Sequence, residues 1–189
     1  QDLLHNVKKL GLTVSEVDKL TGPIIGRPKS ATFRTADVVG LDTLVMVAEG
    51  VHKSGMEAQN FNDVFQLPDY IQTMVSNKWL GAKTEGGFYK KVKNAEGKSE
   101  IHELNLETLE YSAQAKSNFP TLELTKNIDK PIDRFKVLIG GQDKASKLYK
   151  KSLGALFAYV SHKVPEISDE IYKIDDAMRA GLSLIHISE

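Results

Sequence analysis

The chain has 189 residues, and its 25 Lys and Arg residues balance 25 Asp and Glu residues, so the formal net charge is zero. This balance excludes the broad basic field that attracts nucleic acids or anionic membranes. No apolar run approaches the roughly 20 residues that span a bilayer, and the absence of cysteine excludes disulfides and thiolate zinc sites. We therefore predict no nucleic-acid partner and no membrane span.

Two short helices are predicted at the beginning of the chain. The first ends near Gly11 and carries four apolar residues at helical spacing: Leu3, Leu4, Val7 and Leu10. The residues from Thr13 to Glu16 have the pattern of a capping box, in which the side chains of Thr13 and Glu16 each bind the other's backbone amide. This box should begin a second helix, which ends at the break formed by Gly22 and Pro23.

Residues 26–43 combine a loop, a short helix and the beginning of a further helix. Pro28 suits the loop because its ring fixes φ, and Ser30 or Thr32 can cap the helix that follows. The buried face of that helix should consist of three apolar residues at spacings of three: Phe33, Ala36 and Val39. Asp42 or Thr43 can cap the next helix, which should reach about residue 55.

Part of this run follows a pattern found in one enzyme family. The family form is Gly-Pro-Phe, an acidic residue shortly afterwards, and then Gly-Leu-Asp-Thr; here Asp37 and residues 40–43 match it, and Ala31-Thr32-Phe33 replaces Gly-Pro-Phe. The run thus resembles the beginning of the C-terminal, substrate-side domain of the 3-hydroxyacyl-CoA dehydrogenases of fatty-acid β-oxidation. Residues 27–33 are most similar to the long multidomain bacterial type.

A second motif lies in the glycine-rich loop over residues 81–90. It resembles the family signature Gly-x-Lys-Thr-x-x-Gly-Phe-Tyr, and Lys83 stands where the family has a lysine that reaches toward NAD. The resemblance implies that Lys83 binds the cofactor NAD. On the residues alone, a solvated lysine is the alternative, because the glycines permit a close approach to a ribose or phosphate but do not require it.

The remainder of the chain predicts a single hairpin among helices. Strands are expected over residues 88–92 and 99–104, joined by a turn at 94–97, and this is the only convincing β structure. A long helix should begin at Asp143 and end near Val164, because Pro165 should interrupt it. Other helices are expected to begin at Pro68, Thr121, Pro131 and Ser168. The predicted fold class is mainly α, a helical bundle of the dehydrogenase C-terminal-domain type, with one small β-hairpin near 88–104.

The end of the chain contains a weak internal repeat. Residues 15–20 are echoed by residues 172–177, and the resemblance implies that the long dehydrogenases begin a second copy of the domain at such a point. We expect a first, N-terminally truncated copy over residues 1–120 and the beginning of a second, truncated copy over 121–181. Residues 182–189 look like a translated sequencing adapter, with a genuine but unusual C-terminus as the alternative.

The resemblance places the catalytic groups outside this sequence. In the family, a histidine oriented by a glutamate removes the hydroxyl proton, and both belong to the NAD-binding Rossmann domain. The chain has no Gly-x-Gly-x-x-Gly loop and no pair of histidines at metal-ligand spacing. We therefore assign no catalytic residue and no metal site.

Substrate binding is assigned to three residues of the first motif. Arg27 and Lys29, together with Arg34, form a local positive cluster that can meet the phosphates of CoA. Salt bridges from this cluster to adjacent helices are the alternative. Phe33 completes the predicted substrate-binding set as its apolar member.

The sequence thus predicts the substrate-side part of an NAD-dependent 3-hydroxyacyl-CoA dehydrogenase, which oxidises (S)-3-hydroxyacyl-CoA to 3-oxoacyl-CoA and should be inactive as this part alone. The expected partners are the acyl-CoA substrate, the Rossmann domain of the same protein, an enoyl-CoA hydratase domain and a second copy of the protein, in the cytoplasm. The alternative is a helical oligomerisation or interaction module. It would use the apolar faces of residues 1–20 and 143–180 and take no part in the chemistry.

Overall fold

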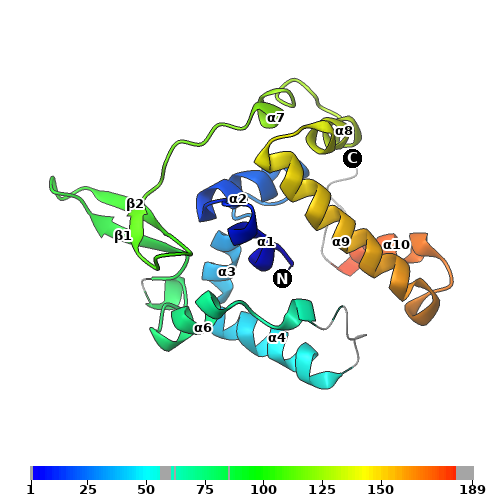
Figure 1. Cartoon of the computed structure of the whole chain (residues 1–189), viewed down its shortest axis with the longest axis horizontal. Helices are drawn as coiled ribbons and strands as arrows, with labels where there is room; N and C mark the ends of the chain where they lie inside the picture. The colour runs from blue at the N-terminus through cyan, green and yellow to red at the C-terminus, as the bar shows by residue number, and fades with distance from the viewer. Residues whose placement is uncertain (1, 56–60, 62, 85, 182–189) are drawn as a thin grey trace.

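The computed structural model describes residues 2–55, 61, 63–84 and 86–181, and the tail predicted to be an artefact, 182–189, lies outside them. Helices make up most of this part of the chain, and a small sheet projects at one end of the molecule (Figure 1). The predicted class, mainly α with a small β element, is confirmed.

The first half of the chain is built from short helices that end at glycines or turns. These are α1 (Asp2–Lys9), α2 (Val14–Thr21), the 3-10 turn η1 (Pro23–Ile25), α3 (Phe33–Val39) and α4 (Leu41–Ser54). The predicted capping box is confirmed, because Glu16 N donates to Thr13 Oγ1 and Thr13 N donates to Glu16 Oε2. Two further 3-10 turns, η2 (Asp63–Phe65) and η3 (Ala82–Thr84), flank α6 (Asp69–Ser76).

The sheet has three antiparallel strands in the order β1 (Tyr89–Lys93), β2 (Ser99–Leu104) and β3 (Tyr111–Ala113). Tyr89 pairs with Glu103 across the predicted hairpin, which is confirmed. The third strand was not predicted. It has only three residues in a polar segment, so its sequence carries no alternation of apolar residues from which a strand could be recognised.

The second half of the chain forms a helical layer beside α1 and α2 (Figure 1). It consists of α7 (Pro120–Glu123), α8 (Pro131–Gly140), α9 (Lys144–Ile167) and α10 (Ile171–Gly181). The prediction that Pro165 interrupts α9 near Val164 is wrong, because the helix continues to Ile167. Proline removes one backbone donor there, close to the helix end, and packing of α9 against α1, α8 and α10 supports the helix.

The hydrophobic core runs across the predicted boundary at residue 120. Leu148 and Tyr149 of α9 belong to the same buried cluster as Val7 and Leu20 of the first helices. Tyr149 also donates its hydroxyl hydrogen to the Leu20 carbonyl at 2.6 Å. The division into copies 1–120 and 121–181 stays a prediction, and α9 packs on the first segment in this structure.

One of the three residues predicted to be buried on α3 is exposed. Val39 at the end of α3 is 49% exposed, whereas Asp37, two residues before it, is buried. The buried face of α3 therefore includes Asp37 in place of Val39, because the Asp37 carboxylate has backbone partners inside the molecule. Leu124 and Ile132 are likewise exposed, at 70% and 65%.

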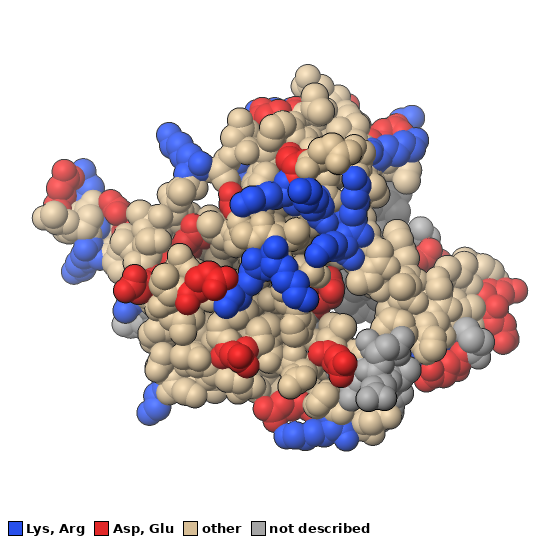
Figure 2. All heavy atoms as spheres, viewed as in Figure 1, with Lys and Arg blue, Asp and Glu red and all other residues tan. Residues whose placement is uncertain are grey.

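The charged side chains are unevenly distributed over the surface (Figure 2), although the formal net charge is zero. Figure 2 shows Lys and Arg side chains gathered at the middle of one face, over α1, α2 and the beginning of α9. Two lysines of these helices are tied to backbone carbonyls, because Lys19 Nζ donates to Ser117 O and Lys144 Nζ to Gly11 O. Within the described ranges, none of the helices has the length and apolar character needed to cross a membrane.

Replacing Tyr149 by phenylalanine tests the junction between α9 and α2. The substitution removes the hydroxyl donor and leaves the buried Leu20 carbonyl unpaired, so we expect the free energy of unfolding to fall by roughly 1–2 kcal/mol. The measurement is chemical denaturation followed by circular dichroism. Tyr172→Phe, at an exposed tyrosine of α10, is the matched control and should leave the midpoint unchanged. Equal midpoints for Tyr149→Phe and the unmodified chain would contradict this role.

Candidate functional site

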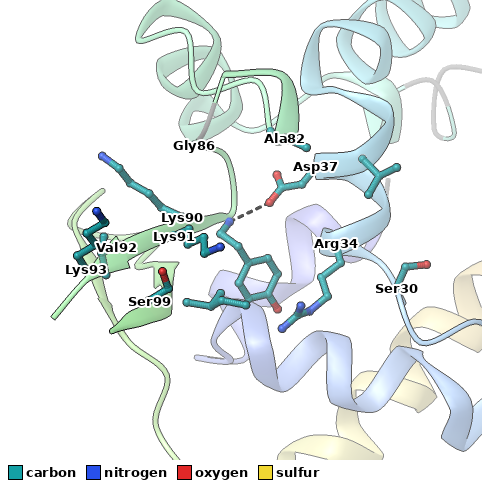
Figure 3. A pocket seen from close by; sticks show the side chains of 14 residues that line it. Ser30, Arg34, Asp37, Ala82, Gly86, Lys90, Lys91, Val92, Lys93 and Ser99 are labelled. Carbon is teal, nitrogen blue, oxygen red and sulfur yellow. Dashed lines mark hydrogen bonds between the residues drawn. The ribbon is translucent and has the colours of Figure 1, made fainter. Parts of the chain in front are cut away.

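The two sequence motifs meet at the carboxylate of Asp37. Its Oδ1 accepts the backbone N–H of Phe88 and its Oδ2 that of Tyr89, each at 2.9 Å. The dashed line in Figure 3 marks one of these bonds, which joins α3 to the beginning of β1. Asp37 is 8% exposed. A carboxylate of the first motif thus holds the end of the glycine-rich loop.

The glycines of this loop are needed because α3 approaches so closely. A side-chain carbon at Gly87 would overlap Asp37 Oδ1, and one at Gly81 would overlap the Asp37 carbonyl oxygen. Gly81 also has φ of +104°, a region that other residues rarely adopt. Gly81 N donates to Gly86 O at 2.8 Å and closes the loop around η3.

A second buried carboxylate, Asp18 of α2, caps α3 from outside the helix. It accepts the backbone N–H groups of Thr32, Phe33 and Arg34 at 3.0, 2.6 and 3.1 Å. The predicted caps Ser30 and Thr32 do not fill this role, since no side-chain cap bond comes from Thr32. The reason is electrostatic as well as geometric, because an ionised carboxylate at a helix N-terminus stabilises the free amides more than a hydroxyl does.

Arg34 and Tyr89 connect the two carboxylates. The hydroxyl of Tyr89 donates to Asp18 Oδ2 at 2.9 Å, and the Arg34 guanidinium lies 4.6 Å from the centroid of the Tyr89 ring. Burial raises the pKa of Asp37 to about 6, against the opposing effect of its two backbone N–H bonds. Burial likewise raises the pKa of Asp18, and burial together with the charge of Asp18 raises that of Tyr89.

A groove of about 820 Å³ lies between α3 and β1, and Figure 3 shows the residues along it. Its cations come from α3 and β1: Arg34, Lys90, Lys91 and Lys93. Arg34 thus belongs to this groove and not to a cluster with the other two predicted cations. Arg27 instead lines a separate apolar cavity, and Lys29 is exposed outside both.

Lys83, the predicted NAD ligand, lies in η3 on the surface of the loop. Its side chain is 52% exposed, and its Nζ lies 3.4 Å from Asp42 Oδ1. The same ammonium borders Gly40, where a side-chain carbon would come within 2.8 Å of it. Asp42 was a predicted cap of α4; its Oδ1 accepts the Thr43 N–H, and that bond with the nearby Lys83 lowers the pKa of Asp42. The structure thus brings Lys83 to the Gly40-Leu41-Asp42-Thr43 motif.

Phe33, the predicted apolar substrate contact, is fully buried. Its ring packs against that of Phe88, with the centroids 4.4 Å apart, and another part of it lines the apolar cavity. The cavity has a volume of about 700 Å³ and lies between the first helices and α9. Contact of Phe33, Arg27 or Lys29 with a substrate stays a prediction.

No role was predicted for Asp18 from the sequence, although one signal was present. The internal repeat aligns Asp18 with Asp175, so an acidic residue recurs at this position of the echoed segment. Asp175 is exposed on α10, however, and a repeat cannot reveal which amides a carboxylate will bind. Across the described ranges, no three metal-binding side chains converge.

These observations define a mainly helical domain in which a glycine-rich loop is fixed by buried aspartates. Residues 1–91 match the family model described as 3-hydroxyacyl-CoA dehydrogenase, C-terminal domain. This part of the chain belongs to that family. Both motifs, residues 26–43 and the loop from Gly81 to Lys90, lie within the match. The search of solved structures returned no match.

Three relatives carry informative names. A "Probable 3-hydroxyacyl-CoA dehydrogenase" of Bacillus subtilis is 42% identical over 178 residues, which are 94% of this chain and 22% of that protein. A protein of the same name from Deinococcus radiodurans is 43% identical over 91 residues, 48% of this chain and 25% of that protein. A "Putative fatty acid oxidation complex trifunctional enzyme" of Rickettsia felis is 23% identical over 167 residues, 88% of this chain and 22% of that protein. The chain therefore spans a quarter or less of the length of these relatives.

The close approach at Gly87 can be tested with a pair of glycine-to-alanine substitutions. Gly87→Ala should lower the free energy of unfolding by about 2–3 kcal/mol, because the new methyl group forces Asp37 or the loop to move. Gly154→Ala, within α9 and with no atom near the added carbon, should instead raise it by about 0.5–1 kcal/mol through helix propensity. Chemical denaturation measures both. The same sign of change in both variants would contradict the proposed packing.

The raised pKa of Asp37 gives a pH-dependent stability. The folded chain keeps this proton up to about pH 6, whereas the unfolded chain releases it near the ordinary value of 3.8. The folded state therefore binds more protons in this window, and stability should fall by roughly 1–3 kcal/mol as the pH rises from 4 to 6. Asp18, whose pKa is also raised, contributes with the same sign.

Asp37→Asn should remove the Asp37 share of this slope, because the amide does not titrate. It should also be less stable than the unmodified chain, since one backbone N–H then faces an amide NH₂. Denaturation curves at pH 4, 5, 6 and 7 give the slope. The exposed Asp169→Asn is the control and should retain it. An unchanged slope in Asp37→Asn would show that the carboxyl titrates normally.

Proposed function

We propose that the chain is the substrate-side helical part of an NAD-dependent 3-hydroxyacyl-CoA dehydrogenase that oxidises (S)-3-hydroxyacyl-CoA to 3-oxoacyl-CoA. The observation that carries this proposal is the 42% identity to the Bacillus subtilis relative over 94% of the chain. The name of the Rickettsia felis relative supports a place in fatty-acid oxidation.

NAD, when bound, accepts the hydride from C3 of the substrate. Lys83 is the residue of this chain that we propose to hold it, by donating to a ribose hydroxyl or a phosphate oxygen. Two observations fit this role: the ammonium is half-exposed, and its contact with Asp42 is long at 3.4 Å. An exposed pair of this kind contributes little to stability, so the lysine can exchange Asp42 for a ligand oxygen at small cost.

Arg27 and Lys29 are proposed to bind the substrate through its phosphates. Both are exposed, and neither forms an ion pair with another described residue. Phe33 is proposed to act on the substrate as part of the cavity wall, because its ring is buried between Phe88 and that cavity. The catalytic base is proposed to lie in the NAD-binding domain.

The remaining partners follow from the same proposal. The chain would work with an NAD-binding Rossmann domain and an enoyl-CoA hydratase domain of the same protein, in the cytoplasm and as a homo-oligomer. Residues 121–181 would begin a second copy of the helical domain. The helix pair α9 and α10 supports this. Like the pair α1 and α2, it consists of two consecutive helices, the second of which carries one member of the internal repeat.

An interaction module is the second candidate function. It is favoured by large apolar side chains that are exposed on the second half of the chain: Phe157, Ile167, Ile171 and Tyr172. The apolar residues of α1 and α2 do not support it, because Leu4, Val7 and Leu20 are buried in the core of the same chain. The two hypotheses differ in what they require of Lys83.

Lys83→Ala in the full-length protein tests the proposed function. The loss of one exposed charge-assisted hydrogen bond should raise the Michaelis constant for NAD about threefold to tenfold, with a smaller change for the acyl-CoA. The assay follows NADH formation from 3-hydroxybutyryl-CoA. Lys53→Ala is the matched control, because Lys53 also forms an exposed ion pair with a carboxylate of α4, Glu49.

Three outcomes separate the hypotheses. Absence of turnover by the unmodified full-length protein refutes the dehydrogenase proposal. A rise in the acyl-CoA constant alone reassigns Lys83 to the substrate. Unchanged constants in Lys83→Ala, as in Lys53→Ala, mean that Lys83 is a solvated surface lysine, as the interaction-module hypothesis requires.

A further inference from the structure

The groove between α3 and β1 carries cations on both of its sides. Arg34 lies on α3, and Lys91 and Lys93 lie across from it on β1 (Figure 3). Side chains alternate between the two faces of a strand, so Lys91 and Lys93 share the face of the sheet to which Tyr89 also belongs. All three cations are exposed. The groove is therefore positively charged on both walls.

The two lysines of this face have no ion-pair partner within the described ranges. Acidic side chains of the same hairpin bind other groups: Glu96 in the turn accepts from Lys98 Nζ at 2.9 Å. Glu100 on β2 accepts from Asn94 Nδ2 at 2.7 Å. Asp37 is the one acidic residue among the described residues of the wall, and both of its oxygens are bound to backbone N–H groups. The charge of the two lysines is therefore available to an external anion.

The same groove exposes apolar surface beside these charges. Val38 on α3 and Ile101 on β2 both line it and are 69% and 47% exposed. Ile101 is the cross-strand partner of Lys91, so the two side chains share one face of the sheet. A small inorganic anion would leave the apolar side chains in water, whereas a peptide with acidic and apolar residues covers both kinds of surface.

The spacing of the two lysines favours an extended peptide. Lys91 and Lys93 are two residues apart on a strand, so their side chains leave the backbone about 7 Å apart. Acidic residues at alternate positions of an extended chain have the same separation, so a peptide that lies along β1 can pair with both lysines at once. The residues between the acidic ones then point to the other side of the peptide, toward Val38 on α3.

We propose that this groove binds an extended segment of a partner protein in which acidic and apolar residues alternate. Two carboxylates of the segment pair with Lys91 and Lys93, and an apolar residue between them covers Val38. The residues that we propose to bind NAD and the acyl-CoA do not line this groove. The inference therefore goes beyond the proposed function and does not rest on it.

Fluorescence anisotropy with the 189-residue chain and two labelled peptides tests the spacing. The probe is acetyl-Glu-Val-Glu-Val-Glu-amide with a fluorescein label, and its matched control is the isomer Glu-Glu-Glu-Val-Val with the same ends and label. We expect the alternating peptide to bind about threefold more tightly or better, because it alone presents carboxylates at the separation of the two lysines. Raising the salt concentration from about 50 to about 300 mM should weaken its binding about threefold or more, since exposed charge pairs are screened.

Charge reversal on β1 tests the site. Lys91→Glu combined with Lys93→Glu should weaken binding of the alternating peptide about tenfold or more, because two attractive pairs become repulsive. The matched control is Lys147→Glu combined with Lys151→Glu, which changes the net charge equally at two exposed lysines of α9 outside the groove. It should change the affinity by no more than about twofold. Should circular dichroism show that the β1 variant is unfolded, Lys91→Gln with Lys93→Gln takes its place, with an expected loss of about fivefold.

The apolar contact is tested with Val38→Gln, at a side chain that is exposed and outside the core. This variant should bind the alternating peptide about threefold more weakly. It should bind the serine analogue Glu-Ser-Glu-Ser-Glu as the unmodified chain does, because serine has no apolar side chain to lose a contact.

Three results overturn the proposal. Equal affinities for the two isomeric peptides refute the extended arrangement along β1. Equal affinities of the β1 and α9 double variants place the binding outside the groove. Displacement of the alternating peptide by an equal concentration of pyrophosphate or CoA assigns the groove to a small polyanion. None of these measurements requires turnover, so failure of this proposal is distinct from failure of the proposed function.

Discussion

The buried carboxylate of Asp37 is the constraint on which the candidate site depends. It lies 51 residues from Phe88 in the sequence and is joined to it, and to Tyr89, by two backbone hydrogen bonds. Burial of this charge is unfavourable by itself, as the raised pKa of Asp37 indicates. The two bonds offset part of that cost, and they require a backbone without side chains at Gly81 and Gly87. One interaction therefore explains both glycine positions and the place of Lys83 between them.

The second buried carboxylate, Asp18, fixes the other end of α3. Asp18 holds the N-terminus of α3 through three amides and also binds the Tyr89 hydroxyl. The helix is thus fixed at its beginning by Asp18, and it fixes β1 through its own Asp37. Both carboxylates bind mainly backbone amides, so these bonds need no particular side chain on the residues that donate them, provided that positions 81 and 87 remain glycine. The fixed backbone in turn determines where the exposed Lys83 ammonium lies relative to Asp42.

The sequence predicts those features whose partners are close in the chain. The capping box at Thr13 and Glu16, the helix after Pro68 and the hairpin with its turn are all set by residues within a few positions of one another, and each is present. The role of Asp18 was not predicted, because its partners are backbone amides 14 to 16 residues away. Nearly every residue has a backbone amide, so the sequence does not indicate which of them a carboxylate binds. The end of α9 was placed too early because tertiary packing outweighs the local effect of Pro165. The motif resemblance located the loop and Lys83, but only the fold places both beside Gly40.

Phe33 links the glycine-rich loop to the apolar cavity, and so joins two parts of the molecule that the sequence presents separately. Its ring packs on Phe88, whose backbone amide binds Asp37, and it also forms part of the cavity wall. Protein interiors are close-packed, so a displacement of this ring on one side must be accommodated on the other. The loop that carries Lys83 and the wall that faces α9 therefore share a single rigid element, α3.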